Sequence, residues 1–141
     1  MKIVLPVDGS ENALRAVRHL VEHVSWFAEL PEIHLLHVHP PIPLGRVQAH
    51  IGHEALHAYY REESEQQLRS AVQQLDAAGL AYTMHIHVGQ PAEVIARLAG
   101  DLDCALILMG SKGLGAFAGA LMGSVATQVL HLTHCPVMIV K

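Results

Sequence analysis

Two short glycine-containing segments carry the most chemistry in this chain. The first is Gly110-Ser111-Lys112-Gly113, and the second, Gly123-Ser124-Val125, follows after nine residues. Glycines allow a tight turn and a close approach of the backbone to a ligand, so that unpaired N–H groups can face it. A hydroxyl residue that opens a helix adds a donor at the positive end of the helix dipole. We therefore interpret the two segments as an anion site, most simply for phosphate.

The spacing of these glycines matches neither of two common phosphate-binding motifs. It is not the G-x-G-x-x-G of dinucleotide-binding domains, and Lys112 is not followed by Ser or Thr as in a P-loop. Lys112 can pair with a phosphate, but its chemistry suits a solvated loop equally well. A surface loop without a ligand is the alternative interpretation, and the strand before the motif and the helix after it disfavour that alternative.

The elements that position these residues alternate between strand-like and helical patterns. Apolar, strand-like runs occur at residues 3–7, 33–38, 82–88, 105–109 and 136–140. The first helix has Ser10 as its expected N-cap and apolar positions from Ala13 to Phe27. Three more helices are expected at 54–78, stopping at Gly79, between Pro91 and Gly100, and after Gly123. This order predicts one α/β domain over residues 1–141, an open five-stranded parallel sheet with helices on both faces.

Ligands bind to such sheets beyond the C-terminal ends of the strands. The glycine segments follow the fourth strand, and Asp8 is the only carboxylate directly at the C-terminal end of any strand. If the first and fourth strands are neighbours, both regions line one crevice and form a coherent nucleotide site. Asp8 can contact a ligand or metal there, or it can cap the turn Asp8-Gly9-Ser10.

Composition narrows the class of protein. The chain of 141 residues is 51% hydrophobic and 16% charged, as in a compact globular protein. A net charge of −4 with only nine Lys and Arg residues argues against nucleic-acid or membrane binding. Cys104 and Cys135 are expected to be buried, reduced thiols. Because Asp8 comes too early for a signal peptide, we expect a soluble, cytoplasmic protein.

Twelve histidines offer a second kind of chemistry. The segment from His53 to His57 matches the zinc-protease pattern H-E-x-x-H, with His50 upstream, but no cleft or fixed third ligand is evident. Weak surface binding of a transition metal is the better interpretation. The pairs His37/His39 and His85/His87 each face one side of a strand. Polar–apolar alternation over 82–88 predicts a half-exposed edge strand rather than a pH-sensitive or metal-linked cluster.

Five segments, in their order and spacing, resemble the universal stress protein family in its ATP-binding branch. The most specific is the motif G-x2-G-x9-G-S that begins at Gly110, and the others are residues 6–11, 35–38, 89–91 and 135–137. The resemblance covers the whole chain. It implies the adenine-nucleotide alpha-hydrolase-like fold with strand order 3-2-1-4-5, and a homodimer joined through the last strand, from Pro136 to Val140.

The resemblance also implies ATP, alone or with Mg²⁺, bound between the first and fourth strands. By position, the backbone of Val38 would meet adenine, with Pro6 and Asp8 nearby. The ribose and phosphates would be wrapped by Gly110, Ser111, Lys112 and Gly113. Gly123, Ser124 and Val125 would close on the phosphates.

Two departures from the family pattern bear on affinity. The insert 114–122 carries no Lys or Arg, and Ala126 stands where nucleotide binders often have Ser or Thr. One lost hydrogen bond to a charged phosphate weakens binding by about 1.5–3 kcal/mol. No catalytic constellation is evident, so we expect a nucleotide-binding regulator of a stress response with at most slow ATP hydrolysis. The alternative is a nucleotide-free dimerisation and interaction module of the same fold.

Overall fold

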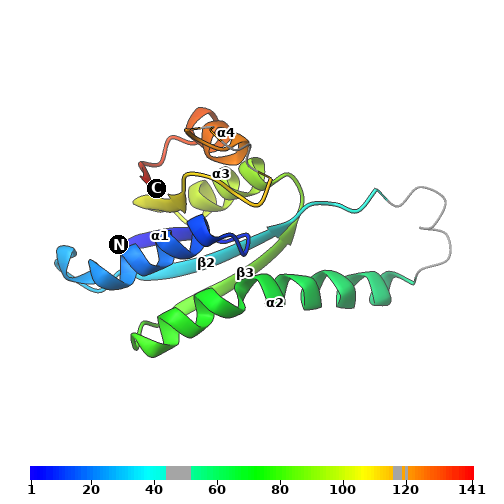
Figure 1. The fold of residues 1–141 in the computed structure, drawn as a ribbon, viewed down its shortest axis with the longest axis horizontal. Coiled ribbons are helices and arrows are strands. Elements are labelled where there is room, and N and C mark those ends of the chain that lie inside the picture. Colours follow the sequence, from blue (N-terminus) through cyan, green and yellow to red (C-terminus); the bar gives the residue numbers. More distant parts are fainter. Residues whose placement is uncertain (44–51, 116–118, 120) are drawn as a thin grey trace.

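The computed structural model describes residues 1–43, 52–115, 119 and 121–141. Five parallel strands form one sheet in the order β3-β2-β1-β4-β5, which confirms the expected fold (Figure 1). Each strand lies within one residue of its predicted bounds. The strands are β1 (Lys2–Pro6), β2 (Glu32–His39), β3 (Tyr82–Val88), β4 (Leu106–Gly110) and β5 (Val137–Val140).

Four helices connect the strands, and the first of them is shorter than its apolar pattern predicts. Helix α1 (Glu11–Glu22) is capped by Ser10, whose Oγ accepts a hydrogen bond from the Ala13 N–H at 3.2 Å. The expected continuation through Val24 to Phe27 is wrong. The backbone N–H and the ring Nδ1 of His23 both contact the His19 carbonyl, and a single 3₁₀ turn, η1 (Val24–Trp26), follows.

The ends of the next two helices show where a left-handed residue is needed. Helix α2 (His53–Ala77) stops at Gly79 as predicted, because Gly79 has φ +67° and the next N–H returns to the Leu75 carbonyl. Helix α3 (Pro91–Asp101) begins at Pro91 as predicted but does not end before Gly100. Instead Asp103, with φ 52°, takes the left-handed conformation and ends the helix.

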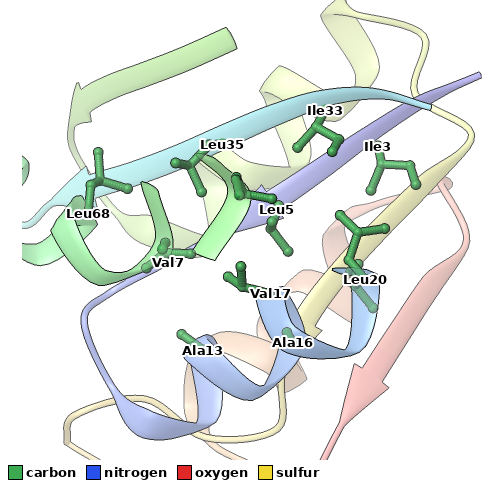
Figure 2. Close-up of a cluster of buried hydrophobic side chains, with 13 residues drawn as sticks. Ile3, Leu5, Val7, Ala13, Ala16, Val17, Leu20, Ile33, Leu35 and Leu68 are labelled. Carbon is green, nitrogen blue, oxygen red and sulfur yellow. The ribbon is translucent and has the colours of Figure 1, made fainter. Parts of the chain in front are cut away.

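Two hydrophobic cores cover the two faces of the sheet. Helices α1 and α2 pack on one face, where Figure 2 shows Leu5 and Ile33 of the strands with Val17 and Leu20 of α1. Helices α3 and α4 (Ser124–Leu132) pack on the other face. Because both faces are covered, the central strands are apolar almost throughout, as parallel strands usually are.

Strand β3 is the edge strand that its polar–apolar alternation predicts. Its apolar side is covered only in part: Tyr82 and Ile86 pack against the core under α2, whereas Met84 and Val88 are more than 40% exposed. Within the part of the chain that the structure describes, no helix is both long enough and apolar enough to cross a membrane. Of the two free cysteines, Cys104 is buried as expected, and Cys135 is only half-buried.

Candidate functional site

A cavity of about 610 Å³ opens at the C-terminal ends of β1, β2 and β4. The predicted site residues come together here, although they lie far apart in the sequence. Those that line the cavity are Pro6, Asp8, Val38, Gly110, Lys112, Gly113, Gly123, Ser124 and Val125. The predicted crevice between the first and fourth strands therefore exists, and its size lies within the usual range of ligand pockets.

Ser111 is the one predicted site residue that does not line the cavity, because it is buried beside it. Its N–H donates to the Val140 carbonyl at 2.8 Å, and its own carbonyl accepts from the Gly123 N–H at 2.7 Å. Ser111 therefore ties the end of β4 to β5 and holds the two glycine segments together.

The glycines of the motif are needed because backbone segments approach one another closely. A Cβ on Gly110 would lie 2.6 Å from the backbone carbonyl group of Asn12, at the start of α1. A Cβ on Gly113 would lie 2.5 Å from a carboxylate oxygen of Asp8, and one on Gly123 would lie 3.2 Å from the Lys112 Cα. Side chains at these positions would fill the space that the bare backbone leaves along the cavity wall.

Asp8 joins the two sides of the cavity. Its Oδ1 accepts a hydrogen bond from the Ser10 N–H at 2.9 Å, and its Oδ2 accepts one from the Leu114 N–H at 3.1 Å. Between Asp8 and Ser10, Gly9 has φ +82°. Of the two roles that the sequence leaves open for Asp8, the structure therefore shows the turn-capping one, and it adds a link to the glycine loop.

The positive features of the cavity are the N-terminus of α4 and one side chain. Gly123 precedes α4 without a side-chain cap, so the first N–H groups of the helix are left for another acceptor. Among the described residues that line the cavity, Lys112 is the only Lys or Arg. An exposed helix N-terminus beside a lysine is suited to bind an anion.

His37 lines the cavity without having been predicted as a site residue. Its ring Nδ1 lies 2.7 Å from the Val7 carbonyl oxygen, so Nδ1 carries the proton in the neutral ring. Burial lowers the pKa of His37 below its ordinary value of 6.5, although the bond to Val7 and the charge of Asp8 act in the opposite direction. The His37 ring is therefore neutral at pH 7, and its Nε2 can accept a hydrogen bond.

Helix α2 contributes two further polar residues, Glu63 and Gln67, to the cavity wall. They lie one helical turn apart, on a stretch whose buried residues are Tyr60, Ser64 and Leu68. Gln67 contacts Gly9, which places α2 against the turn that follows β1. No sequence signal marked these two residues, because polar side chains on a long polar helix ordinarily face solvent.

His39 also lines this cavity, whereas the remaining described histidines lie away from it. His53 and His57 share one face of α2, with their ring centroids 4.4 Å apart, as the H-E-x-x-H pattern requires. Within the described part of the chain, however, no three His, Cys, Asp or Glu side chains are grouped closely enough to hold a metal. His50 lies outside the described residues. On β2 and β3, His34 Nδ1 lies 2.9 Å from His85 Nε2, and burial lowers the pKa of His85.

The fold and the site define a class: α/β proteins with an open parallel sheet and a glycine-bordered cleft at the C-terminal ends of its strands. The model of the Universal stress protein family matches residues 1–141, so the chain belongs to that family. Universal stress protein MJ0531 of Methanocaldococcus jannaschii is 32% identical over 141 residues, which cover 99% of this chain and 81% of that protein.

Solved structures agree with this assignment. The structure of protein MJ0577, from the same organism, has a TM-score of 0.84 and 30% identity, and the match covers 99% of this chain and 94% of that one. A universal stress protein solved in complex with cAMP has a TM-score of 0.68 and 26% identity, and the match covers 100% of this chain and 96% of that one. The family resemblance noted in the sequence is therefore confirmed.

Proposed function

We propose that the cavity binds an adenine nucleotide, with ATP as the resident ligand, and that its occupancy regulates a stress response. The main support is that residues from three strand ends and the α4 N-terminus line one cavity. Those at β1, β4 and α4 were predicted from their chemistry, and Val38 of β2 from the family resemblance. The relative solved with cAMP supports an adenylate in particular. Glycines whose Cβ positions are blocked by backbone or by Asp8 are suited to present main-chain N–H groups to phosphate.

The cavity walls suggest how such a ligand lies. Phosphates would take the side formed by Lys112, Gly123 and the first turn of α4, where the positive features are. The base would take the apolar side, formed by Val38, Ile95 and Met109, which belong to the core under α3. The ribose would then lie between them, near the end of β1.

Mg²⁺ would bind together with the nucleotide rather than to the protein alone. Of the carboxylates in the described cavity wall, Asp8 already accepts two backbone hydrogen bonds. The wall therefore provides no ready-made ligand set for Mg²⁺, which commonly bridges phosphate oxygens and keeps several waters. Asp8 and Glu63 also leave the described wall with two carboxylates against one lysine. Mg²⁺ would reduce the charge of ATP and favour its entry.

Equilibrium titration tests this function directly. Metal-free and Mg²⁺-loaded protein would each be titrated with ATP, and the expected dissociation constant is below about 1 mM, with tighter binding when Mg²⁺ is present. Mass spectrometry of small molecules that co-purify with the native protein would identify the resident adenylate. No measurable binding at millimolar ATP in either condition would overturn the proposal.

The same fold without a nucleotide is the second candidate function. Two observations favour it: Ala126 is buried without a hydroxyl, and the Leu114 N–H already has a partner in Asp8. The substitution Gly113→Val separates the candidates, because a side chain there meets the Asp8 carboxylate and blocks backbone approach. Gly100→Val is the matched control, because Gly100 does not line the cavity and a Cβ on it meets no described residue within 4 Å.

Under the nucleotide hypothesis, Gly113→Val moves the dissociation constant for ATP beyond the millimolar range, whereas Gly100→Val changes it about twofold or less. A stress phenotype that survives Gly113→Val would instead support the nucleotide-free module. Equal losses in both variants would assign the effect to a general loss of stability rather than to the site.

We further propose a cytoplasmic homodimer joined through β5. All four residues of β5 are half-buried and apolar, and β5 is an edge strand, so its outer backbone groups can pair with a second copy. Sedimentation at micromolar concentration should give twice the mass of the chain. A monomer under these conditions would contradict the proposed assembly.

A further inference from the structure

We propose that Glu63 of α2 accepts hydrogen bonds from the ribose hydroxyls of the bound nucleotide, so that the protein selects ribonucleotides over 2′-deoxyribonucleotides. This inference rests on the proposed adenine-nucleotide site. It adds a specificity-determining side chain from a helix that the glycine motif does not include.

Two carboxylates line the described part of the cavity, and their oxygens are occupied to different extents. Both oxygens of Asp8 accept backbone N–H groups, from Ser10 on one side and Leu114 on the other. Glu63, the other carboxylate in the described wall, forms no hydrogen bond or ion pair with any other described residue. A half-buried carboxylate at a cavity wall, whose oxygens accept no hydrogen bond from a described residue, is suited to bind donor groups of a ligand.

The layers of the fold determine which part of a nucleotide Glu63 would meet. Helix α2 covers one face of the sheet, and α3 and α4 cover the other (Figure 1). Because Glu63 belongs to α2, it reaches the cavity from the face opposite to the α4 N-terminus. Phosphates placed at α4 are therefore kept away from this carboxylate, which would repel them. The apolar wall of Val38, Ile95 and Met109 lies under α3, where the flat base fits.

Between the base and the phosphates, only the ribose carries hydroxyl donors. Carboxylates commonly accept hydrogen bonds from ribose hydroxyls at the C-terminal edge of other α/β sheets. Glu63, at the α2 side of the cavity, is placed to do so here.

Helix α2 holds Glu63 in a fixed position at the cavity wall. Ser64 and Leu68, its neighbours on α2, are both completely buried, and they fix this part of the helix against the sheet. One turn after Glu63, Gln67 contacts Gly9 in the turn that contains Asp8. The helix wall and the end of β1 are therefore in direct contact, so Glu63 is presented from a fixed element rather than from a loop.

The test compares ATP with 2′-deoxy-ATP in three proteins: the wild type, Glu63→Ala and Glu62→Ala. Glu62 is the matched control, because it precedes Glu63 on the same helix, carries the same charge and is exposed. Alanine suits a helix interior at both positions, and thermal melting would verify that both variants fold. Isothermal titration in excess Mg²⁺ would give the dissociation constants.

The wild type is expected to bind ATP about tenfold more tightly than 2′-deoxy-ATP, as one hydrogen bond to a charged group implies. Glu63→Ala should lower that ratio to about one, mainly by weakening ATP binding, whereas Glu62→Ala should keep it at about ten. A wild type that binds both nucleotides equally, or a Glu63→Ala variant that keeps the preference, would overturn this inference while leaving the nucleotide site intact. A wild type that binds neither nucleotide would overturn both proposals.

Discussion

The two rims of the cavity are built in opposite ways. We call Gly110–Gly113 together with Gly123 and Ser124 the glycine rim, and Asp8, Glu63 and Gln67 the carboxylate rim. At the glycines of the glycine rim, what matters is the absence of side chains, because a Cβ added to Gly110 would lie 2.6 Å from neighbouring backbone. In the carboxylate rim, the side chains themselves form the wall and hold the turn after β1.

This difference determines how each rim responds to mutation. Backbone cannot move aside as the end of a side chain can, so a carbon added at Gly110, which faces backbone atoms, should disturb the whole sheet edge. In the carboxylate rim, a substitution removes particular hydrogen bonds or a particular charge, and its effect should be local. The glycine rim is thus suited to bind the phosphates, which many nucleotides share. The carboxylate rim is suited to bind the groups that distinguish one ligand from another.

The largest effect is expected from Gly110→Ala. A Cβ at this position would meet the carbonyl group of Asn12 at 2.6 Å and the Ala13 nitrogen at 2.8 Å, all of them backbone atoms of the N-terminal region of α1. We expect the free energy of unfolding to fall by about 3 kcal/mol, because either α1 or β4 must shift. Urea denaturation of both proteins, followed by circular dichroism, measures the change.

A loss smaller than about 1 kcal/mol would mean that α1 and β4 separate easily. The two rims would then differ less in rigidity than the structure indicates. Gly115→Ala is the appropriate control, because it adds the same carbon to the same loop where nothing lies within 4 Å.

The sequence predicts the glycine rim far better than the carboxylate rim, and the reason is physical. Glycines at fixed spacing between a strand and a helix point to close backbone approach, so Gly110, Gly113 and Gly123 stand out. Glu63 and Gln67 are ordinary polar residues of a long polar helix, and only the packing of α2 against the β1 turn brings them to the cavity. Which polar face of a helix meets a cavity is a tertiary property that periodicity alone does not reveal.

The fold was predictable for a related reason. Each strand is an apolar run between turn residues, and the helix ends at Gly79 and Pro91 follow local backbone preferences. The wrong predictions concern helix ends that are set by a side-chain contact or by a residue in an unusual backbone conformation. His23 contacts the His19 carbonyl, and α1 ends earlier than predicted. Asp103 takes a left-handed conformation and ends α3, whereas the sequence pattern predicted that end at Gly100.

A smaller effect is expected from the titration of His37, which lines the same cavity but belongs to neither rim. Burial lowers the pKa of His37 in the folded protein, with His39 acting in the same direction and Val7 and Asp8 in the opposite one. As the pH falls below 6.5, His37 takes up a proton in the unfolded chain before it does so in the folded protein. Stability is therefore fully present above pH 6.5 and is lost as the pH falls towards the folded pKa, by at most about 1.4 kcal/mol per pH unit for one histidine.

The variant His37→Asn keeps a side-chain N–H for the Val7 carbonyl but cannot take up a proton in this range. Its free energy of unfolding, measured between pH 7.5 and 5, should fall less steeply than that of the wild type. Some slope should persist, because the pKa of His85 is also lowered by burial. Parallel curves for the two proteins would mean that His37 takes up its proton equally in the folded and the unfolded state. The cavity wall at His37 would then be accessible to water.

The smallest effect, and the one of opposite sign, is expected from Gly100→Ala. It makes the same chemical change as Gly110→Ala, but Gly100 is exposed near the end of α3 and an added Cβ meets nothing within 4 Å. Because Gly100 has no positive φ and lies within the helix, alanine should raise the free energy of unfolding by about 0.5–1 kcal/mol. Urea denaturation under the conditions used for Gly110→Ala gives a direct comparison.

A loss of stability would mean that the helix stops at Gly100, as the sequence pattern predicted, and that Gly100 rather than Asp103 supplies the left-handed residue. A gain would show that glycine is required at Gly110 because of its surroundings at the rim of the cavity, and that a glycine elsewhere in the chain can be replaced.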